Sequence, residues 1–324
     1  MKLLSLNIRH GGGKRFEKIK NYLSLHKFDV LLLQEFRDNA TGHLIKEHLK
    51  KLGLQHAYNK TDNKQNTVLT AAKELNEISI GTKVNDWSCL ITEINSVTII
   101  NVYFPQKKDK KVVFRFIKEI VKGRKNTIVA GDFNTGNNEL DAQGANFYCS
   151  NEFTELSEDI LNDAYRLLHK NKTEYSWYSN KGNGFRVDHV LVSDDLQDDI
   201  RAISYDQSTR LNATDHAALH VEFFPQNEIS ILISTLKKDS KTFECKFYDY
   251  VSQIESFDWM SWDKGKDFFV DNSNKKLSCF NKDELKKLLL MVTRVDRFND
   301  GFYMTQKNNG TLLQILNELK QKQI

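Results

Sequence analysis

The sequence has few features that would constrain the fold covalently. Its 324 residues include four cysteines, and these form no CxxC pair and no spacing typical of a zinc site. We therefore expect reduced thiols in a cytoplasmic protein. No stretch approaches the roughly 20 apolar residues that cross a bilayer, and residues 1–7 lack the long apolar segment of a signal peptide. The sequence predicts no membrane-embedded part.

The sequence also lacks a strong charge of either sign. The formal net charge is +4, from 47 basic and 43 acidic residues. It is evenly divided, with 31 basic and 29 acidic residues before position 226 and 16 and 14 after it. Affinity for nucleic acid would therefore depend on a local patch. The run Lys107, Lys108, Lys110 and Lys111 is one candidate, and it is equally typical of a solvated loop.

A change of pattern near Pro225 predicts two domains, 1–225 and 226–324. Before it, apolar runs indicate strands, and helical spacing is limited to two segments. The strands are expected at 3–8, 30–34, 68–72, 79–82, 89–93, 97–103, 127–130, 185–192 and 217–224, and the helices at 15–26 and 110–122. After it, helices are expected at 228–237, 248–256, 264–270, 282–292 and 312–319. Asn281 and Glu284 resemble a capping box.

Polar side chains follow several of the predicted strands. Asp132 and Asn134 come directly after the apolar run 128–130, and Glu35 follows 30–34. Asn7, the pair Asp188 and His189, and the pair Asp215 and His216 adjoin further strands. Taken singly, each motif is also typical of a turn or a solvated strand end. Together they would supply the oxygen ligands that Mg²⁺ prefers and an imidazole to offset charge on a phosphate.

Seven segments in this order resemble the endonuclease/exonuclease/phosphatase superfamily, near its exonuclease III and DNase I branch. They are LNIRHGGG from Leu6, LLLQEFR from Leu31, NVYFP from Asn101, VAGDFNTG from Val129, EYSWYS from Glu174, NGFRVDHVLVS from Asn183 and ATDHAAL from Ala213. The resemblance covers residues 1–224. It implies an α/β (α+β) four-layer sandwich of two packed mixed β-sheets flanked by helices. The helical spacing after residue 225 predicts a small all-α domain.

The resemblance also implies roles for individual residues. Glu35 would bind Mg²⁺, with Mn²⁺ as an alternative ion, while Asn7 and Asp215 would lie near or share it. Asp132 would orient or deprotonate the attacking water, and Asn134 would contact the phosphate. Tyr103 would point its hydroxyl at a phosphate oxygen or at Asp132. His216 would stabilise the reacting phosphate, with its ring held by Asp188. The candidates for substrate contact are Asn7, Arg9, His10, Trp177, Arg186 and His189.

These observations predict a Mg²⁺-dependent phosphodiesterase, a nuclease acting on DNA, with RNA left open. One alternative is a phosphatase or phospholipid phosphodiesterase with the same site. Another is a nuclease-like module whose residues 226–324 recruit a protein partner or self-associate. These residues resemble a bacterial helical domain of unknown function, in which we expect Trp259, Trp262 and Phe298 to belong to the core. Trp177 fits a base-stacking residue and a core residue equally well.

Overall fold

The computed structural model describes residues 1–60, 64–78, 88–223, 228–238, 240–270 and 276–322. The chain divides into two compact units, Met1–Pro225 and Gln226–Ile324. The division falls where the sequence pattern changes from strands to helices. In the described part of the chain, no helix combines the length and apolar character needed to cross a bilayer.

Two six-stranded sheets form the centre of the first unit. One has the order β13-β14-β1-β2-β4-β3 and the other β5-β6-β7-β8-β12-β9. The first contains β1 (Lys2–Asn7), β2 (Val30–Phe36), β3 (Gln55–Tyr58), β4 (Thr67–Ala72), β13 (Ile200–Asp206) and β14 (Ala218–Phe223). The second contains β5 (Asn76–Glu77), β6 (Cys89–Ile94), β7 (Val97–Tyr103), β8 (Thr127–Asp132), β9 (Asn162–Asp163) and β12 (Asp188–Val192). Both sheets are mixed, because β1–β2 and β7–β8 are parallel whereas β1–β14 and β8–β12 are antiparallel.

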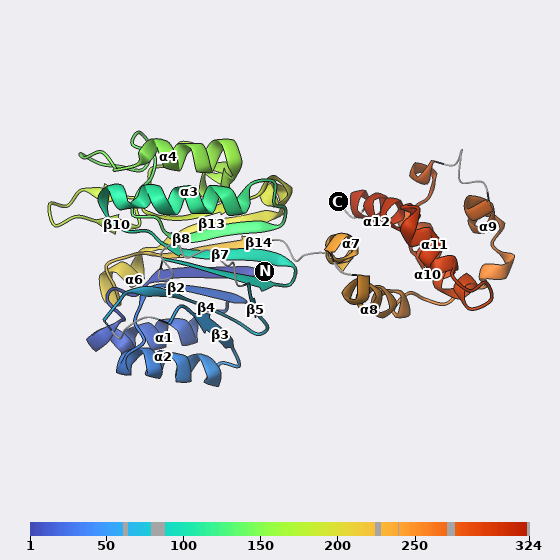
Figure 1. Cartoon of the computed structure of the whole chain (residues 1–324), viewed down its shortest axis with the longest axis horizontal. Coiled ribbons are helices and arrows are strands. Elements are labelled where there is room, and N and C mark those ends of the chain that lie inside the picture. The colour runs from blue at the N-terminus through green and yellow to red at the C-terminus, as the bar shows by residue number, and fades with distance from the viewer. Residues whose placement is uncertain (61–63, 79–87, 224–227, 239, 271–275, 323–324) are drawn as a thin grey trace. The chain divides into compact units, whose positions relative to one another are not determined.

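Helices cover the outer faces of the sheets, which gives four layers (Figure 1). Residues of α1 (Phe16–Leu25) and α2 (Ala40–Lys51) share a core with β1 and β2, and those of α3 (Lys110–Val121) and α4 (Ser150–Thr154) share one with β7 and β8. Along β2, Val30 and Leu32 pack between the sheets while Leu31 and Leu33 pack under the helices. The two-residue period of a strand therefore explains why these runs are apolar throughout.

The remaining elements of this unit are short. A turn of π-helix, Glu155–Ile160, continues α4. Two helices, α5 (Ala164–Leu168) and α6 (Gln207–Asn212), and a small sheet of β10 (Trp177–Tyr178) and β11 (Gly184–Phe185) complete it. Of the sequence predictions, the strand expected at 185–192 is divided between β11 and β12, and α2 and β13 were not anticipated. The strand expected at 79–82 lies outside the described residues.

The second unit is helical. It consists of α7 (Glu228–Lys238), α8 (Ser240–Ser252), α9 (Asp263–Val270), α10 (Lys282–Asp296), α11 (Phe302–Asn308) and α12 (Thr311–Gln321). The capping box that starts α10 is confirmed, since Asn281 accepts from the Glu284 amide and Glu284 from the Asn281 amide. The helix expected at 248–256 is α8, which begins and ends earlier. Trp262 packs on the core, but Phe298 is 75% exposed, so its expected core position is wrong.

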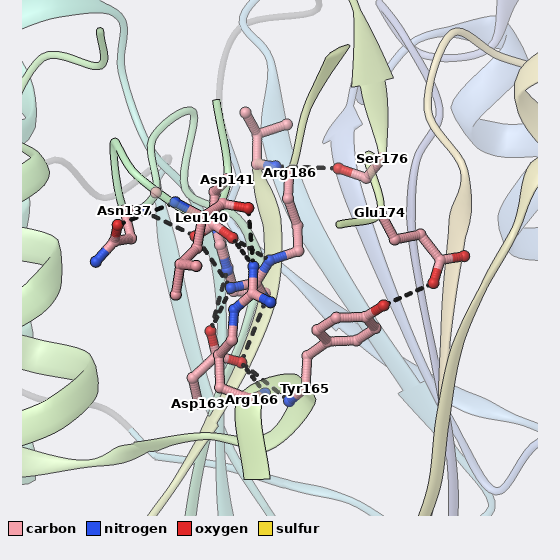
Figure 2. Close-up of polar contacts among 12 residues, drawn as sticks. Asn137, Leu140, Asp141, Asp163, Tyr165, Arg166, Glu174, Ser176 and Arg186 are labelled. Atoms are coloured by element: carbon pink, nitrogen blue, oxygen red, sulfur yellow. Dashed lines mark hydrogen bonds and ion pairs between the residues drawn. The ribbon is translucent and has the colours of Figure 1, made fainter. Parts of the chain in front are cut away.

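A buried ionic network fixes the loop that precedes α4 (Figure 2). Arg186 is fully buried, and its guanidinium donates to Asp141 at 2.7 and 3.0 Å and to Asp163 at 3.2 and 2.5 Å. Arg166 also pairs with Asp141 and donates to the Leu140 carbonyl. The Tyr165 ring lies beneath the Arg186 guanidinium. Two arginines and two carboxylates thus join the loop near 141 to β9, α5 and the segment before β12.

The opposite charges in this network compensate one another, so removal of one of them lowers the stability of the fold. Burial would raise the pKa of Asp163 and Asp141, but the Arg186 charge, the hydrogen bonds to the carboxylates and the neighbouring His189 together outweigh burial and lower both values. Removing one partner of a buried ion pair leaves an uncompensated charge, which costs about 3–5 kcal/mol. The two carboxylates therefore stabilise the fold only while Arg186 is present.

We expect Arg186→Met to lower the free energy of unfolding of the first unit by about 3–5 kcal/mol at neutral pH. The difference in the free energy of unfolding between Arg186→Met and the original protein should become smaller below about pH 4, where carboxyls in an unfolded chain become protonated. The sign follows from the lowered pKa values, which give stability above that pH and lose it in acid. Urea unfolding at several pH values measures this.

Arg201→Met is the matched control, because Arg201 forms an exposed pair with Glu222 at 3.3 Å. Such a pair contributes under about 1 kcal/mol. Equal effects of the two substitutions would contradict the role assigned to the network.

Candidate active site

A cleft of about 330 Å³ opens where strands of both sheets end. Asn7 and Asp132 are the last residues of β1 and β8, Glu35 lies one residue before the end of β2, and Asp188 begins the antiparallel β12. The cleft is lined by Glu35, Gln106, Lys110, Asp132, Asn134, Asn146, Phe147, Tyr148, Trp177, Phe185, Val187, Asp215 and His216. The lining thus combines polar groups with aromatic rings.

A backbone irregularity aims Glu35 into the cleft. Glu35 has a φ of 56°, and the register of β2 with β4 shifts between Gln34 and Phe36. Such a bulge turns a side chain out of the alternation of its strand. Glu35 Oε2 accepts hydrogen bonds from the His10 amide at 2.7 Å and from Asn66 at 3.0 Å. The carboxylate is therefore fixed in position at the edge of the cleft.

Asn7 joins the two carboxylates from the different sheets. Its Nδ2 donates to Asp132 Oδ2 at 2.9 Å and to Glu35 Oε1 at 3.2 Å, while its Oδ1 accepts from the Arg9 amide at 2.9 Å. The amide nitrogen, and not the oxygen, thus faces the carboxylates. This orientation suits a residue that holds Glu35 and Asp132 in place. That Asn7 is also a metal ligand stays a prediction.

Asp132 is buried and carries an unusual pKa. Burial raises this pKa to about 7, the nearby Asp188 charge adds to the effect, and His216 and hydrogen bonds from Asn134 and Asn7 oppose it. Asp132 Oδ1 accepts from the Asn134 amide at 2.8 Å. Asn134 has a φ of 51°, its Nδ2 donates to the Phe104 carbonyl, and its Oδ1 accepts from Gln106.

His216 forms a buried pair with Asp188. Its Nδ1 lies 2.8 Å from Asp188 Oδ2, and both residues are less than 7% exposed. Burial lowers the pKa of His216, but the charges of Asp188 and Asp132 and the bond to Asp188 outweigh burial and raise it to about 10. His216 is therefore an imidazolium at neutral pH. It can stabilise negative charge or donate a proton in the cleft.

Tyr103 ends β7 beside these groups. Its hydroxyl accepts a hydrogen bond from Asn66 at 3.5 Å. Burial, together with the charges of Glu35 and Asp132, raises the pKa of Tyr103. The hydroxyl consequently stays protonated and can donate a hydrogen bond to an anion.

Further predicted residues lie at the exposed rim. Asp215 pairs with Arg9 at 3.4 Å, and His10 lies 3.0 Å from Glu35. The Arg9 and His10 side chains are 50% and 63% exposed. Trp177 lines the cleft, lies near Phe185 and forms a backbone bridge to His216. These side chains line the cleft or lie next to it, where a substrate could contact them.

The structure does not bring Arg186 and His189 to a substrate, so that prediction is wrong. Both are fully buried. Arg186 is used by the ionic network. His189 follows Asp188 in β12 and points to the opposite face, where its Nε2 lies 2.8 Å from the Thr135 carbonyl and its ring lies beside Phe133 and Phe153.

Sequence reasoning did not single out several residues of this region. They are Asn66, Gln106 and Lys110, together with the lining residues Asn146, Phe147, Tyr148, Phe185 and Val187. Asn66 contacts Glu35 and Tyr103, and Gln106 contacts Asn134. Lys110 is only 2% exposed, yet it lines the cleft, and no carboxylate of the described residues forms an ion pair with it. The sequence indicated Gln106 and Lys110 only by their position shortly after NVYFP. Nothing in the lysine run distinguished Lys110 from its neighbours.

Comparison with known proteins agrees with this geometry. Residues 4–216 match the model of the endonuclease/exonuclease/phosphatase family, and residues 230–323 match a family of unknown function. An AP endonuclease from Archaeoglobus fulgidus superposes with a TM-score of 0.61 and 20% identity, over 69% of this chain and 99% of that one. A 3′–5′ exonuclease from Neisseria meningitidis gives 0.60 and 21%, over 69% and 100%. The chain thus belongs to the endonuclease/exonuclease/phosphatase family.

Proposed function

We propose that this protein is a Mg²⁺-dependent nuclease that hydrolyses phosphodiester bonds of DNA. One observation carries the proposal: the imidazolium of His216, held by Asp188, faces the carboxylate of Asp132 in a cleft that also contains Glu35. Cleavage of a phosphodiester needs a group that handles the proton of water and a cation near the phosphate oxygens. The cleft has both within one small volume.

The donor set at the cleft fits a hard divalent cation. Glu35 and Asp215 both line it, and both offer carboxylate oxygens, which Mg²⁺ and Mn²⁺ prefer. We assign Glu35 and Asp215 as the residues that would hold the ion. When bound, Mg²⁺ would offset negative charge on the phosphate.

The chain's own residues supply the remaining chemistry. Asp132, with its raised pKa, takes a proton from the water that attacks phosphorus, while Asn7 and the Asn134 amide hold its carboxylate. Asn134 and Tyr103 contact the phosphate, and His216 balances the charge that develops on its oxygens. The new P–O bond forms to water, and the bond to the leaving sugar oxygen breaks. That oxygen leaves with a proton from solvent or His216.

The choice of DNA is supported by the cleft and by similar folds. Phe147, Tyr148, Trp177 and Phe185 line the cleft, and bases or sugars can pack on their rings. The similar folds include the AP endonuclease, the 3′–5′ exonuclease and a 3′ phosphatase from Neisseria bound to a product DNA hairpin, which has a TM-score of 0.59 and 20% identity, over 69% of this chain and 99% of that one. We also propose that the helical unit binds a protein partner or regulates the activity. We further propose that the protein is cytoplasmic.

We expect the purified chain to cleave DNA with Mg²⁺ or Mn²⁺ and to lose activity with EDTA. Asp132→Asn should lower turnover by at least ~10², because it removes the group that handles the proton of water. Single-stranded, nicked, abasic and intact duplex DNA, matched RNA and small phosphoesters form the substrate panel. Asp159→Asn, an exposed carboxylate of the same unit, is the control.

Unchanged turnover by Asp132→Asn would contradict the role of Asp132 as the group that takes the proton of water. Cleavage of small phosphoesters without cleavage of any polynucleotide would favour a phosphatase or a phospholipid phosphodiesterase instead of a nuclease.

Lys110 is a further candidate for binding the DNA backbone. It is the first residue of α3, where the helix dipole disfavours a cation. Burial lowers the pKa of Lys110, and nearby Cys149 and Asp132 offset this only in part. A buried cation without an ion-pair partner is costly unless something compensates it. A phosphate of the substrate would provide that compensation.

We expect Lys110→Met to raise KM about 10–100-fold, since a hydrogen bond to a charged group contributes about 1.5–3 kcal/mol. The value of kcat should change little if the contact is equally strong in the transition state. Steady-state kinetics on the preferred DNA measures both constants. Lys108→Met, at an exposed position of the same lysine run, should leave KM unchanged; a similar rise in both variants would indicate a general charge effect.

A further inference from the structure

A second cluster of metal-ligating side chains lies away from the cleft, on the side of the first sheet that α1 covers. It consists of His26, Asp206 and His220, which come from the end of α1, the end of β13 and the middle of β14. One ligand atom from each lies within 4.8 Å of the others. None of the three lines the catalytic cleft.

Hydrogen bonds orient two of these side chains for coordination. His26 Nδ1 lies 2.9 Å from the Tyr22 carbonyl, which can only accept, so this nitrogen carries the proton. The lone pair is then on Nε2, which lies 3.8 Å from Asp206 Oδ2. Asp206 Oδ1 accepts from the Ser208 amide at 2.9 Å, which leaves Oδ2 for the cluster. Metal-ligating histidines are commonly fixed in this way by a carbonyl behind the ring.

The third proposed ligand, His220, is hydrogen-bonded to Tyr22. Its Nε2 lies 2.6 Å from the Tyr22 hydroxyl, whose single proton is donated to Asp206 Oδ2 at 2.9 Å, so Nε2 donates to that hydroxyl. To bind an ion through Nε2, the His220 ring must carry its proton on Nδ1 instead. The neutral form of imidazole is the one that binds metals.

We propose that His26, Asp206 and His220 form a binding site for a transition-metal ion of the Zn²⁺ class, distinct from the Mg²⁺ site of the cleft. Two imidazoles with one carboxylate suit Zn²⁺, Ni²⁺ or Cu²⁺, whereas Mg²⁺ prefers oxygen ligands. Three protein ligands leave a fourth position for water or for the Tyr22 hydroxyl.

Small movements would close the site. Ligand atoms of a tetrahedral zinc site lie about 3.4 Å apart, given Zn–N and Zn–O distances near 2.1 Å. Side chains of His26 and Asp206 are 36% and 29% exposed, so they can turn without disturbing the core. The Tyr22 hydroxyl, which now bridges Asp206 and His220, would give up these bonds to the ion.

Metal binding here would connect elements that are distant in sequence. Asp206 caps α6 by accepting from Ser208, and within α6 Thr209 lies 3.0 Å from the His216 carbonyl and donates to it. An ion at Asp206 would therefore fix the start of the segment that carries Asp215 and His216. We infer a structural role, because the cluster itself has no contact with the cleft.

The full-length chain, stripped of metal by a chelator, is titrated with Zn²⁺ in excess Mg²⁺, and bound zinc is counted by mass spectrometry after desalting. His26→Ala should weaken zinc binding by at least ~10-fold. His43→Ala, an exposed histidine of α2, should not. Glu35→Gln, which removes a proposed ligand of the cleft, should retain the zinc assigned to the cluster.

X-ray absorption at the zinc edge of the Glu35→Gln chain supplies a readout that does not depend on the folding of a histidine variant. Scattering from two imidazole rings is the expected result. Zinc affinity unchanged by His26→Ala in a folded chain, or a spectrum without imidazole scattering, would overturn the proposal. In either case the cluster would be a hydrogen-bonded group without an ion, and the proposed nuclease activity would be unaffected.

Discussion

Two buried carboxylates placed opposite each other are the constraint on which the site depends. Asp132 and Asp188 are paired residues of the antiparallel β8 and β12, so the register of two strands forces their charges together. Neither is solvated, and the Asp188 charge disfavours ionisation of Asp132. The imidazolium of His216 makes the arrangement stable, because its charge compensates both. The same compensation leaves Asp132 with a pKa near neutrality, which a proton acceptor needs.

The backbone accommodates this arrangement at one glycine. Gly131, which precedes Asp132, has a φ of 140°, and a Cβ added there would lie 2.1 Å from the Val102 carbonyl oxygen. The absence of a side chain therefore lets β8 pack against β7 at the end of the strand. Asn7 then spans the gap to the other sheet by donating to Asp132 and Glu35. Asn7, Glu35 and Asp132 thus lie at or next to the ends of strands in the two large sheets. Segments outside these sheets supply the aromatic residues of the cleft.

Much of the fold and part of the site were predictable from the sequence. The fold followed from strand-length apolar runs and from ordered motifs, and Asn7, Glu35, Asp132, Asp188 and His216 were identifiable because strand ends converge. Arg186 was not, since its partners lie 23 and 45 residues away and a buried arginine resembles an exposed one in sequence. Lys110 was hidden in a lysine run of which it is the buried member. The residues of the proposed zinc site are separated by up to 194 positions, so no local pattern reveals them.

The ionic network around Arg186 also limits how this enzyme can be redesigned. The segment from Asn137 to Tyr148 contributes Asn146, Phe147 and Tyr148 to the cleft, and it is tied to the body through Asp141. A loop taken from another protein of this fold would have to bring an equivalent carboxylate, or Arg166 would lose its carboxylate partner and Arg186 one of its two. The same loop therefore determines both the lining of the cleft and part of the stability of the fold. It can be exchanged only together with a carboxylate at the position of Asp141.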